Sequence, residues 1–389
     1  MKRLRLALTA ILLAPLAGCN MVVLNPSGDV AMQQRDLVLI STGLMLLVIL
    51  PVMALTVLFA WRYRQSNTQA TYDPDWDHST KLELVIWAVP LLIIIALGAF
   101  TWMGTHLLDP YRPIGRVASG KPVAADHSPL EVDVVALDWK WLFILPEYGI
   151  ATVNELAAPV DRPLRFRITS SSVMNSFYIP ALAGQIYAMP GMETKLHAVI
   201  NEPGDFVGFS AQYSGHGFSK MRFRFHGLDQ AGFDQWVNEV KQADGMLDRA
   251  TYLKLEQPSE GDPVRHFSGV DPELFDAVVN MCPEPGKMCM GEMMAIDAKG
   301  GLGLEGIRNT LPLTYDKYAR RGSVLGPEPR MVAGICSRAE AIASADRKDP
   351  PLRDASTPLI GHGLPRPFAD PPSTAMTLSS ATPLDLDAL

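Results

Sequence analysis

Cysteine is scarce in this chain. Only four residues of 389 are cysteine, and they stand at Cys19, Cys282, Cys289 and Cys336. They are too few and too scattered for the disulfide framework that holds small secreted domains together. The core must therefore be stabilised by burial of apolar side chains. The composition allows this, because 48% of the residues are hydrophobic and the mean hydropathy of +0.10 is high for a soluble protein of this length.

Clusters of basic residues are also missing. Lysine and arginine total 34 against 41 acidic residues, which gives a net charge of -7 and an isoelectric point of about 5.6. Binding to nucleic acid requires clustered Lys and Arg to neutralise phosphates, so nucleic acid is excluded as a partner. The sequence also lacks a phosphate-binding loop, a nucleophile beside its base, and an acid-base pair. We therefore expect no active site on this chain.

Two long apolar runs, 37–61 and 84–103, contain no ionisable residue. Each is sufficient to cross ~30 Å of hydrocarbon as a helix. Buried helices of a soluble domain are the alternative, but two charge-free runs exceed what a small core can enclose. The sequence therefore predicts a transmembrane hairpin within 19–105. Spans without ionisable residues favour docking to a partner over ion transport.

The amino terminus has the pattern of a bacterial lipoprotein signal. Residues 1–18 start with basic side chains, continue with an apolar run and end in Leu-Ala-Gly before Cys19. Cleavage there would leave Cys19 as a lipidated, palmitate-carrying first residue outside the cytoplasm. An ordinary signal peptide with an incidental cysteine is the alternative. With Cys19 in the periplasm, two membrane crossings place everything after Thr105 in the periplasm as well.

Beyond a polar connection, the hydrophobic period changes from helical to alternating. Apolar and polar residues alternate along four short segments: 132–136, 164–168, 196–200 and 221–225. Several such segments with turn signals between them indicate an antiparallel β-sandwich of about 100 residues, which we place at 130–228. Trp139 and Trp141 are interpreted as packing residues of this domain. Lys140 separates them.

An amphipathic helix follows from Asp229 to about Lys241. Its apolar residues have helical spacing: Phe233, Trp236, Val237 and Val240. This stripe is either a lid on the sandwich or a docking face for a partner. The helix opens an arm at 229–280, which also contains strand-like residues and a short helix near its end.

The segment Ser210–Met221 reads, by itself, as a glycine-containing turn. It resembles the C-x-x-x-C-x-x-x-H-x-x-M copper loop of cytochrome c oxidase subunit II, with most ligands replaced. Ser210 and Ser214 stand where that loop has its bridging cysteines, and Phe218 replaces its histidine. Asn175 corresponds to the upstream histidine, and Met221 is retained. Gln212 stands where a backbone carbonyl is the ligand.

This pattern is similar to subunit II of the cytochrome bo-type ubiquinol oxidases, from about Cys19 to about Asn280. The resemblance implies a membrane-anchored all-β chain with a periplasmic cupredoxin-like domain after the hairpin. It further implies a non-catalytic subunit of a proton-pumping quinol oxidase in the bacterial inner membrane. This chain would carry no cofactor, and the haems and copper would belong to the large subunit. The expected partners are that large subunit, the other oxidase subunits, membrane lipid and, through the complex, ubiquinol; cytochrome c is not expected.

Histidines and sulfur-containing residues are further candidates for metal ligands. His197, His216 and His226 lie near the loop in sequence, but none has a second ligand at standard spacing. The sulfur-rich segment 281–294 is either a soft copper(I) site or a turn closed by a Cys282 to Cys289 disulfide, which would leave Cys336 unpaired. A free-standing periplasmic copper-binding or sensor lipoprotein that uses this segment is the alternative function.

Residues 281–347 are expected to be irregular and the Pro-rich tail at 348–389 disordered.

Overall fold

The computed structural model describes residues 21–71, 74–124, 128–298, 310–312 and 330–332. The predicted signal peptide, Cys19, Cys336 and the Pro-rich tail lie outside these residues. The chain divides into two compact units, Met1–Ser337 and Arg338–Leu389. Every residue described below belongs to the first unit.

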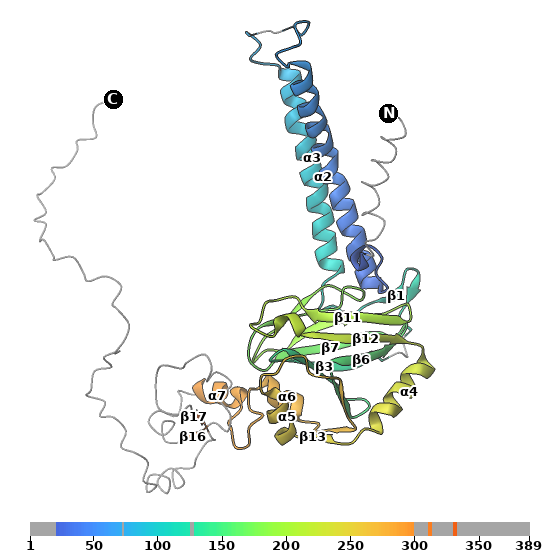
Figure 1. The fold of residues 1–389 in the computed structure, drawn as a ribbon, viewed down its shortest axis with the longest axis vertical. Coiled ribbons are helices and arrows are strands. Elements are labelled where there is room, and N and C mark those ends of the chain that lie inside the picture. The colour runs from blue at the N-terminus through green and yellow to red at the C-terminus, as the bar shows by residue number, and fades with distance from the viewer. Residues whose placement is uncertain (1–20, 72–73, 125–127, 299–309, 313–329, 333–389) are drawn as a thin grey trace, which may run out of the picture. The chain divides into compact units, whose positions relative to one another are not determined.

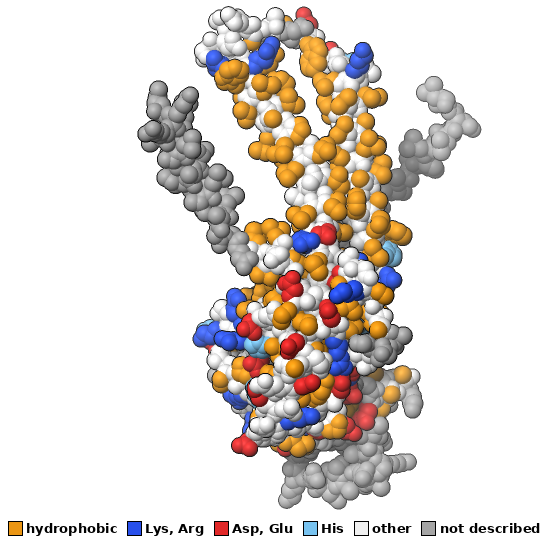
Figure 2. All heavy atoms as spheres, turned by 90° about the vertical axis from the view of Figure 1, so that its right-hand side faces the viewer, with side chains coloured by type: hydrophobic (Ala, Val, Ile, Leu, Met, Phe, Trp, Pro, Cys, Tyr) orange, Lys and Arg blue, Asp and Glu red, His pale blue; other side chains and the backbone are white. Residues whose placement is uncertain are grey.

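Two long helices form the amino-terminal part of the described chain. The 3₁₀ helix η2 (Val22–Leu24) precedes α2 (Asp29–Arg62) and α3 (Thr80–Leu107), which lie side by side as a hairpin (Figure 1). Both have an 18-residue window of mean hydropathy 2.6 whose side chains are not buried within the structure. Hydrophobic side chains cover the middle of the hairpin, and charged ones gather at its ends (Figure 2). The predicted spans lie inside these helices, which extend beyond them because polar residues continue the helical hydrogen bonding.

The β-rich domain consists of two sheets packed face to face. The six-stranded sheet has the order β10 (Thr194–Ala198), β7 (Leu164–Ser170), β3 (Leu130–Leu137), β4 (Lys140–Leu145), β5 (Ile150–Val153), β14 (Arg265–Phe267). The five-stranded sheet has the order β6 (Glu155–Pro159), β12 (Arg222–Leu228), β11 (Gly204–Ser210), β8 (Asn175–Tyr178), β9 (Ile186–Ala188). Pairing is mostly antiparallel, but β3 with β7 and β12 with β6 are parallel. The predicted membrane-anchored sandwich is therefore confirmed.

Aromatic side chains fill the space between the sheets. The rings of Phe177 and Phe223 stack with centroids 5.5 Å apart, and Trp141 meets both edge-on at 5.3 and 5.7 Å. The alternation along β12 explains this arrangement, because Phe223 and Phe225 are buried whereas Arg222 and Arg224 are exposed. Aromatic contacts of this kind stabilise beyond the area they bury. Trp141 is thus a core residue.

Helix α4 (Gln230–Lys241) covers one end of the sandwich. Its predicted apolar stripe is buried: Phe233, Trp236, Val237 and Val240. Asp229 caps the helix by accepting a 2.8 Å hydrogen bond from the Gly232 amide. Of the two interpretations of this helix, the lid is the one the structure shows. The connection before the sandwich also contains a small hairpin that the sequence did not indicate, β1 (Arg116–Ala118) with β2 (Lys121–Pro122).

The arm packs on the outer face of the six-stranded sheet. It contains β13 (Met246–Leu247), α5 (Arg249–Glu256), β14, β15 (Gly269–Val270) and α6 (Leu274–Val279). Strand β14 extends the sheet by pairing with β5. Tyr252 and Phe275 of the arm join a second hydrophobic core with Leu142 of β4 and Val135 of β3. The six-stranded sheet is therefore buried on both faces, which explains why β4 is buried at every position.

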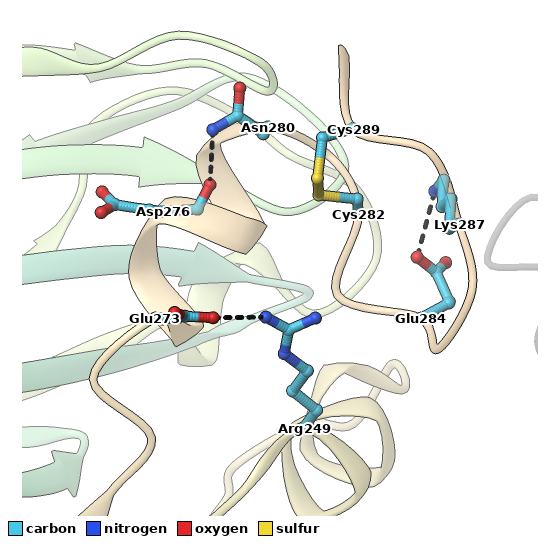
Figure 3. The surroundings of a disulfide bond; sticks show 8 residues. All are labelled: Arg249, Glu273, Asp276, Asn280, Cys282, Glu284, Lys287 and Cys289. Carbon is cyan, nitrogen blue, oxygen red and sulfur yellow. Dashed lines mark hydrogen bonds and ion pairs between the residues drawn. A yellow bond between two sulfur atoms is a disulfide. The ribbon is translucent and has the colours of Figure 1, made fainter. Parts of the chain in front are cut away.

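The segment after α6 is more regular than expected. Cys282 and Cys289 form a disulfide (Figure 3). The expectation of an irregular extension from residue 281 is wrong at 290–297, where α7 (Met290–Asp297) forms. Methionine, glutamate and alanine dominate this stretch, and all three have high helix propensity. Two further strands, β16 (Thr310–Pro312) and β17 (Arg330–Val332), pair with each other.

We predict that Phe177→Ala destabilises the sandwich by about 3–5 kcal/mol, because it opens a cavity among stacked rings. The measurement is urea unfolding of the detergent-solubilised full chain, followed by tryptophan fluorescence. The control is Val207→Ala on the outer face of β11, where 52% of the residue is exposed. A change within about 0.5 kcal/mol is expected for that control. Equal effects of the two substitutions would contradict the proposed core.

Candidate functional site

The positions that resemble copper ligands lie at one end of the five-stranded sheet. Asn175 begins β8, Ser210 ends β11, and Met221 directly precedes β12. Strand β11 pairs with both β8 and β12, so these three residues are neighbours. The Ser210 amide donates to the Met221 carbonyl at 3.2 Å. The sheet thus gathers residues that are up to 46 positions apart in the sequence.

The first serine and the asparagine bond to each other. The Ser210 hydroxyl lies 3.1 Å from Asn175 Oδ1 and 3.1 Å from the Gln212 carbonyl. It also accepts a hydrogen bond of 3.4 Å from the Ser176 amide. The Asn175 amide group donates to the Val173 carbonyl at 3.1 Å. Because both side chains are almost fully buried, these bonds satisfy groups that would otherwise destabilise the fold.

The remaining positions of the loop are equally occupied by protein contacts. The Ser214 hydroxyl lies 3.9 Å from the sulfur of Met221, which is 1% exposed. Phe218 lies in the 3₁₀ helix η3 (Phe218–Lys220), and its ring packs edge-on against Tyr213 at 5.6 Å. The five positions therefore form a hydrogen-bonded and packed end of the domain.

Trp139 supports this loop from the β3–β4 turn. It has a left-handed backbone with φ of 67°, and its indole nitrogen donates to the Ser214 carbonyl at 3.1 Å. A Cβ at Gly217 would lie 2.5 Å from Trp139 Cδ2, so only glycine fits beneath the indole. The structural role predicted for this tryptophan agrees with these contacts.

The donor set does not fit a dinuclear copper centre. Such a centre needs thiolate and imidazole ligands, whereas this site offers hydroxyl groups, one amide, one phenyl ring and one thioether. The nearby histidines do not replace them. His197 bonds to the Pro110 carbonyl at 3.0 Å, His216 contacts Glu260, and His226 lies on β12 beside Asp205. Within the described part of the chain, no group of three or more His, Cys, Asp or Glu could hold a metal ion.

Lys140 is a buried lysine whose role the sequence did not reveal. It is 1% exposed, and its ammonium group donates to the Gln257 carbonyl at 2.8 Å and contacts Ser259. Asp262 Oδ2 lies 3.2 Å from the same nitrogen. Burial lowers the pKa of Lys140, and the charge of Asp262 opposes that effect. Lys140 therefore joins the strand beneath the loop to the arm.

Glu155 is a second charged residue that joins the sandwich to the arm, and the sequence did not indicate this role. We call Lys140, Glu155 and Arg167 the anchors of the arm. Its carboxylate accepts hydrogen bonds from His266 Nε2 at 2.6 Å, His226 Nε2 at 3.3 Å and Trp236 Nε1 at 3.3 Å. The hydrogen bond from His226 is the largest of the interactions that lower the pKa of Glu155 to about 2. The other ring nitrogen of His226 faces Asp205. Carboxylates only accept hydrogen bonds, so the Glu155 hydrogen bond and the Asp205 contact favour the doubly protonated ring and raise the pKa of His226.

Arg167 forms the third anchor. It lies 3.5 Å from Asp133, 3.0 Å from Glu193 and 2.9 Å from Asp276 of α6, and its guanidinium stacks over Phe275 at 4.6 Å. Burial raises the pKa of Asp133 to about 7, although Arg167 opposes this. The arm is thus bound to the sandwich by three charged groups on different strands.

We predict that the Glu155 anchor makes stability depend on pH. The folded-state pKa of His226 is raised above its ordinary value of 6.5 by the Glu155 hydrogen bond. Its contribution is therefore complete below pH 6.5 and is lost as the pH rises through the folded value. The pKa of Glu155 is lowered from 4.5 to about 2, so its contribution is present above pH 4.5 and is lost toward pH 2.

The measurement compares His226→Gln with the wild-type chain by urea unfolding at pH 6 and pH 9. We expect the variant to lose about 1–2 kcal/mol at pH 6 and less at pH 9, because a charged hydrogen bond disappears only where the imidazolium exists. The control is His216→Gln, since the side chain of His216 is 86% exposed. A loss that is the same at both pH values would contradict the imidazolium.

Family models match the domain and the arm separately. The model described as "Cytochrome C oxidase subunit II, periplasmic domain" matches residues 130–226. The model described as "COX Aromatic Rich Motif" matches residues 241–286. The second match covers most of the arm and ends between the two cysteines of the disulfide.

Similar proteins match a longer part of the chain than the two family models do. The "Cytochrome bo(3) ubiquinol oxidase subunit 2" of Pseudomonas putida is 55% identical over 265 residues, which are 68% of this chain and 82% of that protein. The "Ubiquinol oxidase subunit 2" of Acetobacter aceti is 52% identical, over 68% of this chain and 83% of that protein.

Among solved structures, the periplasmic domain of subunit II of cytochrome oxidase (CoxB) of Bradyrhizobium japonicum is 20% identical. The matched region covers 30% of this chain and 96% of the CoxB domain, with a TM-score of 0.28. The identities and coverage of the curated relatives show that this chain belongs to the ubiquinol oxidase subunit 2 family of the haem-copper oxidases.

Proposed function

We propose that this chain is the non-catalytic, membrane-anchored subunit II of a proton-pumping ubiquinol oxidase, which reduces oxygen to water. The observation that carries the proposal is the closed end of the five-stranded sheet. There Asn175 and Ser210 bond to each other where a copper centre would need imidazole and thiolate. The relatives named as ubiquinol oxidase subunit 2 support the same conclusion. They do not favour a free-standing copper-binding or sensor lipoprotein.

The electron donor follows from where electrons enter. An oxidase that accepts electrons from cytochrome c needs a metal relay in its periplasmic domain, whereas a quinol delivers electrons from within the membrane. The donor set at Asn175, Ser210, Ser214 and Phe218 is unsuited to that relay. The haems and the copper of the reaction then belong to the large subunit. This chain supports that subunit and does not conduct electrons.

The hairpin is the docking element of this proposal. The apolar side chains in the middle of α2 and α3 contact little else in the described chain, and most are exposed. The spans carry no ionisable residue, which suits contact with lipid and with the helices of the large subunit and not an ion path. The chain would lie in the bacterial inner membrane with its β-rich domain in the periplasm.

Restoring the replaced ligands tests this assignment. The variant with Asn175→His, Ser210→Cys, Ser214→Cys and Phe218→His, next to the native Met221, should bind copper and develop visible thiolate-to-copper absorption. The matched control omits both Ser210→Cys and Ser214→Cys and should stay colourless, because no thiolate ligand is then present. The unmodified complex should oxidise ubiquinol and not reduced cytochrome c. Thiolate-to-copper absorption in the unmodified chain, or rapid turnover with cytochrome c, would overturn the proposal.

The lipid anchor is a separate part of the proposal. The lipoprotein signal sequence before Cys19 is followed by the three exposed apolar residues of η2, Val22, Val23 and Leu24, which suit a membrane surface. Mass analysis of the mature chain should show a lipidated amino-terminal Cys19. A Cys19→Ala variant should remain in the membrane, because two spans outweigh one lipid anchor. A mature chain that retains Met1 would contradict this part.

A further inference from the structure

Two methionine sulfurs converge over Gly191. This glycine lies in the turn between β9 and β10 and has φ of +71°. A Cβ built on it would lie 3.3 Å from the sulfur of Met281 and 3.3 Å from the sulfur of Met290. The nearest atom to that Cβ position, at 3.1 Å, is the methyl carbon of Met290. The three heavy atoms nearest to this Cβ position, outside Gly191 and its chain neighbours, thus all belong to thioether groups. Because each sulfur lies 3.3 Å from the same position, the distance between the two sulfurs is at most twice that value.

The disulfide holds these two methionines together. Met281 directly precedes Cys282, and Met290 directly follows Cys289. The bonded cysteines have Cα atoms 4.9 Å apart, and Figure 3 shows the loop that they close beside α6. The Met290 amide also donates to the Asn280 carbonyl at 2.8 Å. The two thioethers are therefore presented from the ends of one cross-linked loop.

The backbone conformation of Met281 is energetically unfavourable. Its φ is 58°, a left-handed conformation that side chains other than Gly, Asn and Asp seldom adopt. Such conformations persist where the surrounding structure holds them, and they cluster at functional sites. Both methionines are only partly buried, so an ion from solvent could reach their sulfurs.

The chemistry of the site selects a soft cation. Thioether sulfur is a soft, uncharged ligand that suits copper(I) and carries no proton to displace. The cysteines are committed to the disulfide, and the nearby carboxylate of Glu284 is paired with Lys287 at 3.1 Å. Hard ions such as calcium or magnesium require several oxygen ligands, which this pair does not offer. We propose that Met281 and Met290 form a two-thioether site for copper(I) over Gly191, with the disulfide as its positioning element.

This site is independent of the oxidase assignment. Copper(I) has a filled d shell, and when bound to thioethers it gives no thiolate-to-copper band. Its presence would therefore leave the chain colourless, so it cannot be confused with a restored dinuclear centre. The inference also survives if the subunit proves to have another electron donor.

Competition for copper(I) tests the affinity. The detergent-solubilised full chain, with its disulfide intact, is titrated against a chromophoric copper(I) chelator under ascorbate. We expect one copper(I) ion per chain, and Met281→Leu with Met290→Leu should weaken binding at least about tenfold, as loss of metal-site residues generally does. Leucine conserves the volume of methionine, so the fold should persist. The control is Met246→Leu, a 58% exposed methionine of β13, which should leave binding unchanged.

Protection from oxidation tests the location. Silver(I), a redox-silent analogue of copper(I), is added before brief exposure to peroxide, and methionine sulfoxide is quantified by peptide mass analysis. Silver should protect Met281 and Met290 together and leave Met246 unprotected. Equal oxidation of all three methionines with and without silver would overturn the proposal. So would a double leucine variant that competes for copper(I) as well as the native chain does.

Discussion

The contact between Phe177 on β8 and Phe223 on β12 is the constraint on which the rest of the domain depends. Their rings stack at 5.5 Å between the sheets, and the two strands flank β11 on either side. This packing fixes the register of all three strands, since a slip by one residue would turn the buried rings to the solvent. The register in turn places Asn175, Ser210 and Met221 side by side. The positions that resemble copper ligands are thus adjacent because core packing holds them there.

Adjacent positions without a metal must satisfy their own polar groups. In a copper centre the side chains at these positions would be held by the ion, and here hydrogen bonds between Ser210, Asn175 and the Gln212 carbonyl take over that role. Burying hydroxyl and amide groups without partners would be destabilising. The hydrogen bonds of Ser210 and Asn175 therefore keep the loop ordered, and the Trp139 indole donates a further hydrogen bond to the Ser214 carbonyl.

The arm is fastened to the sandwich by charge as well as by apolar contact. Lys140 reaches the arm from beneath the loop, Glu155 binds His266 of β14, and Arg167 binds Asp276 of α6. Each anchor brings a buried or partly buried charge to an opposite one, so removal of one member leaves the other unpaired. Such pairs fix position more than they add stability. They set the disulfide-closed loop, and with it Met281 and Met290, against the turn that contains Gly191.

The membrane hairpin, the alternating strands, the apolar stripe of α4 and the positions that resemble copper ligands could all be predicted from the amino-acid sequence. Each of these depends on residue type and local spacing, which a single chain displays directly. The roles of the isolated charged residues could not be predicted in this way, because Lys140, Glu155 and Arg167 each find a partner more than 100 positions away in the sequence. Only the tertiary structure decided these roles, and it also decided that 290–297 is helical and that Met281 and Met290 meet over Gly191. No periodic pattern encodes such meetings, since they arise when sheet register and a cross-linked loop bring distant segments together.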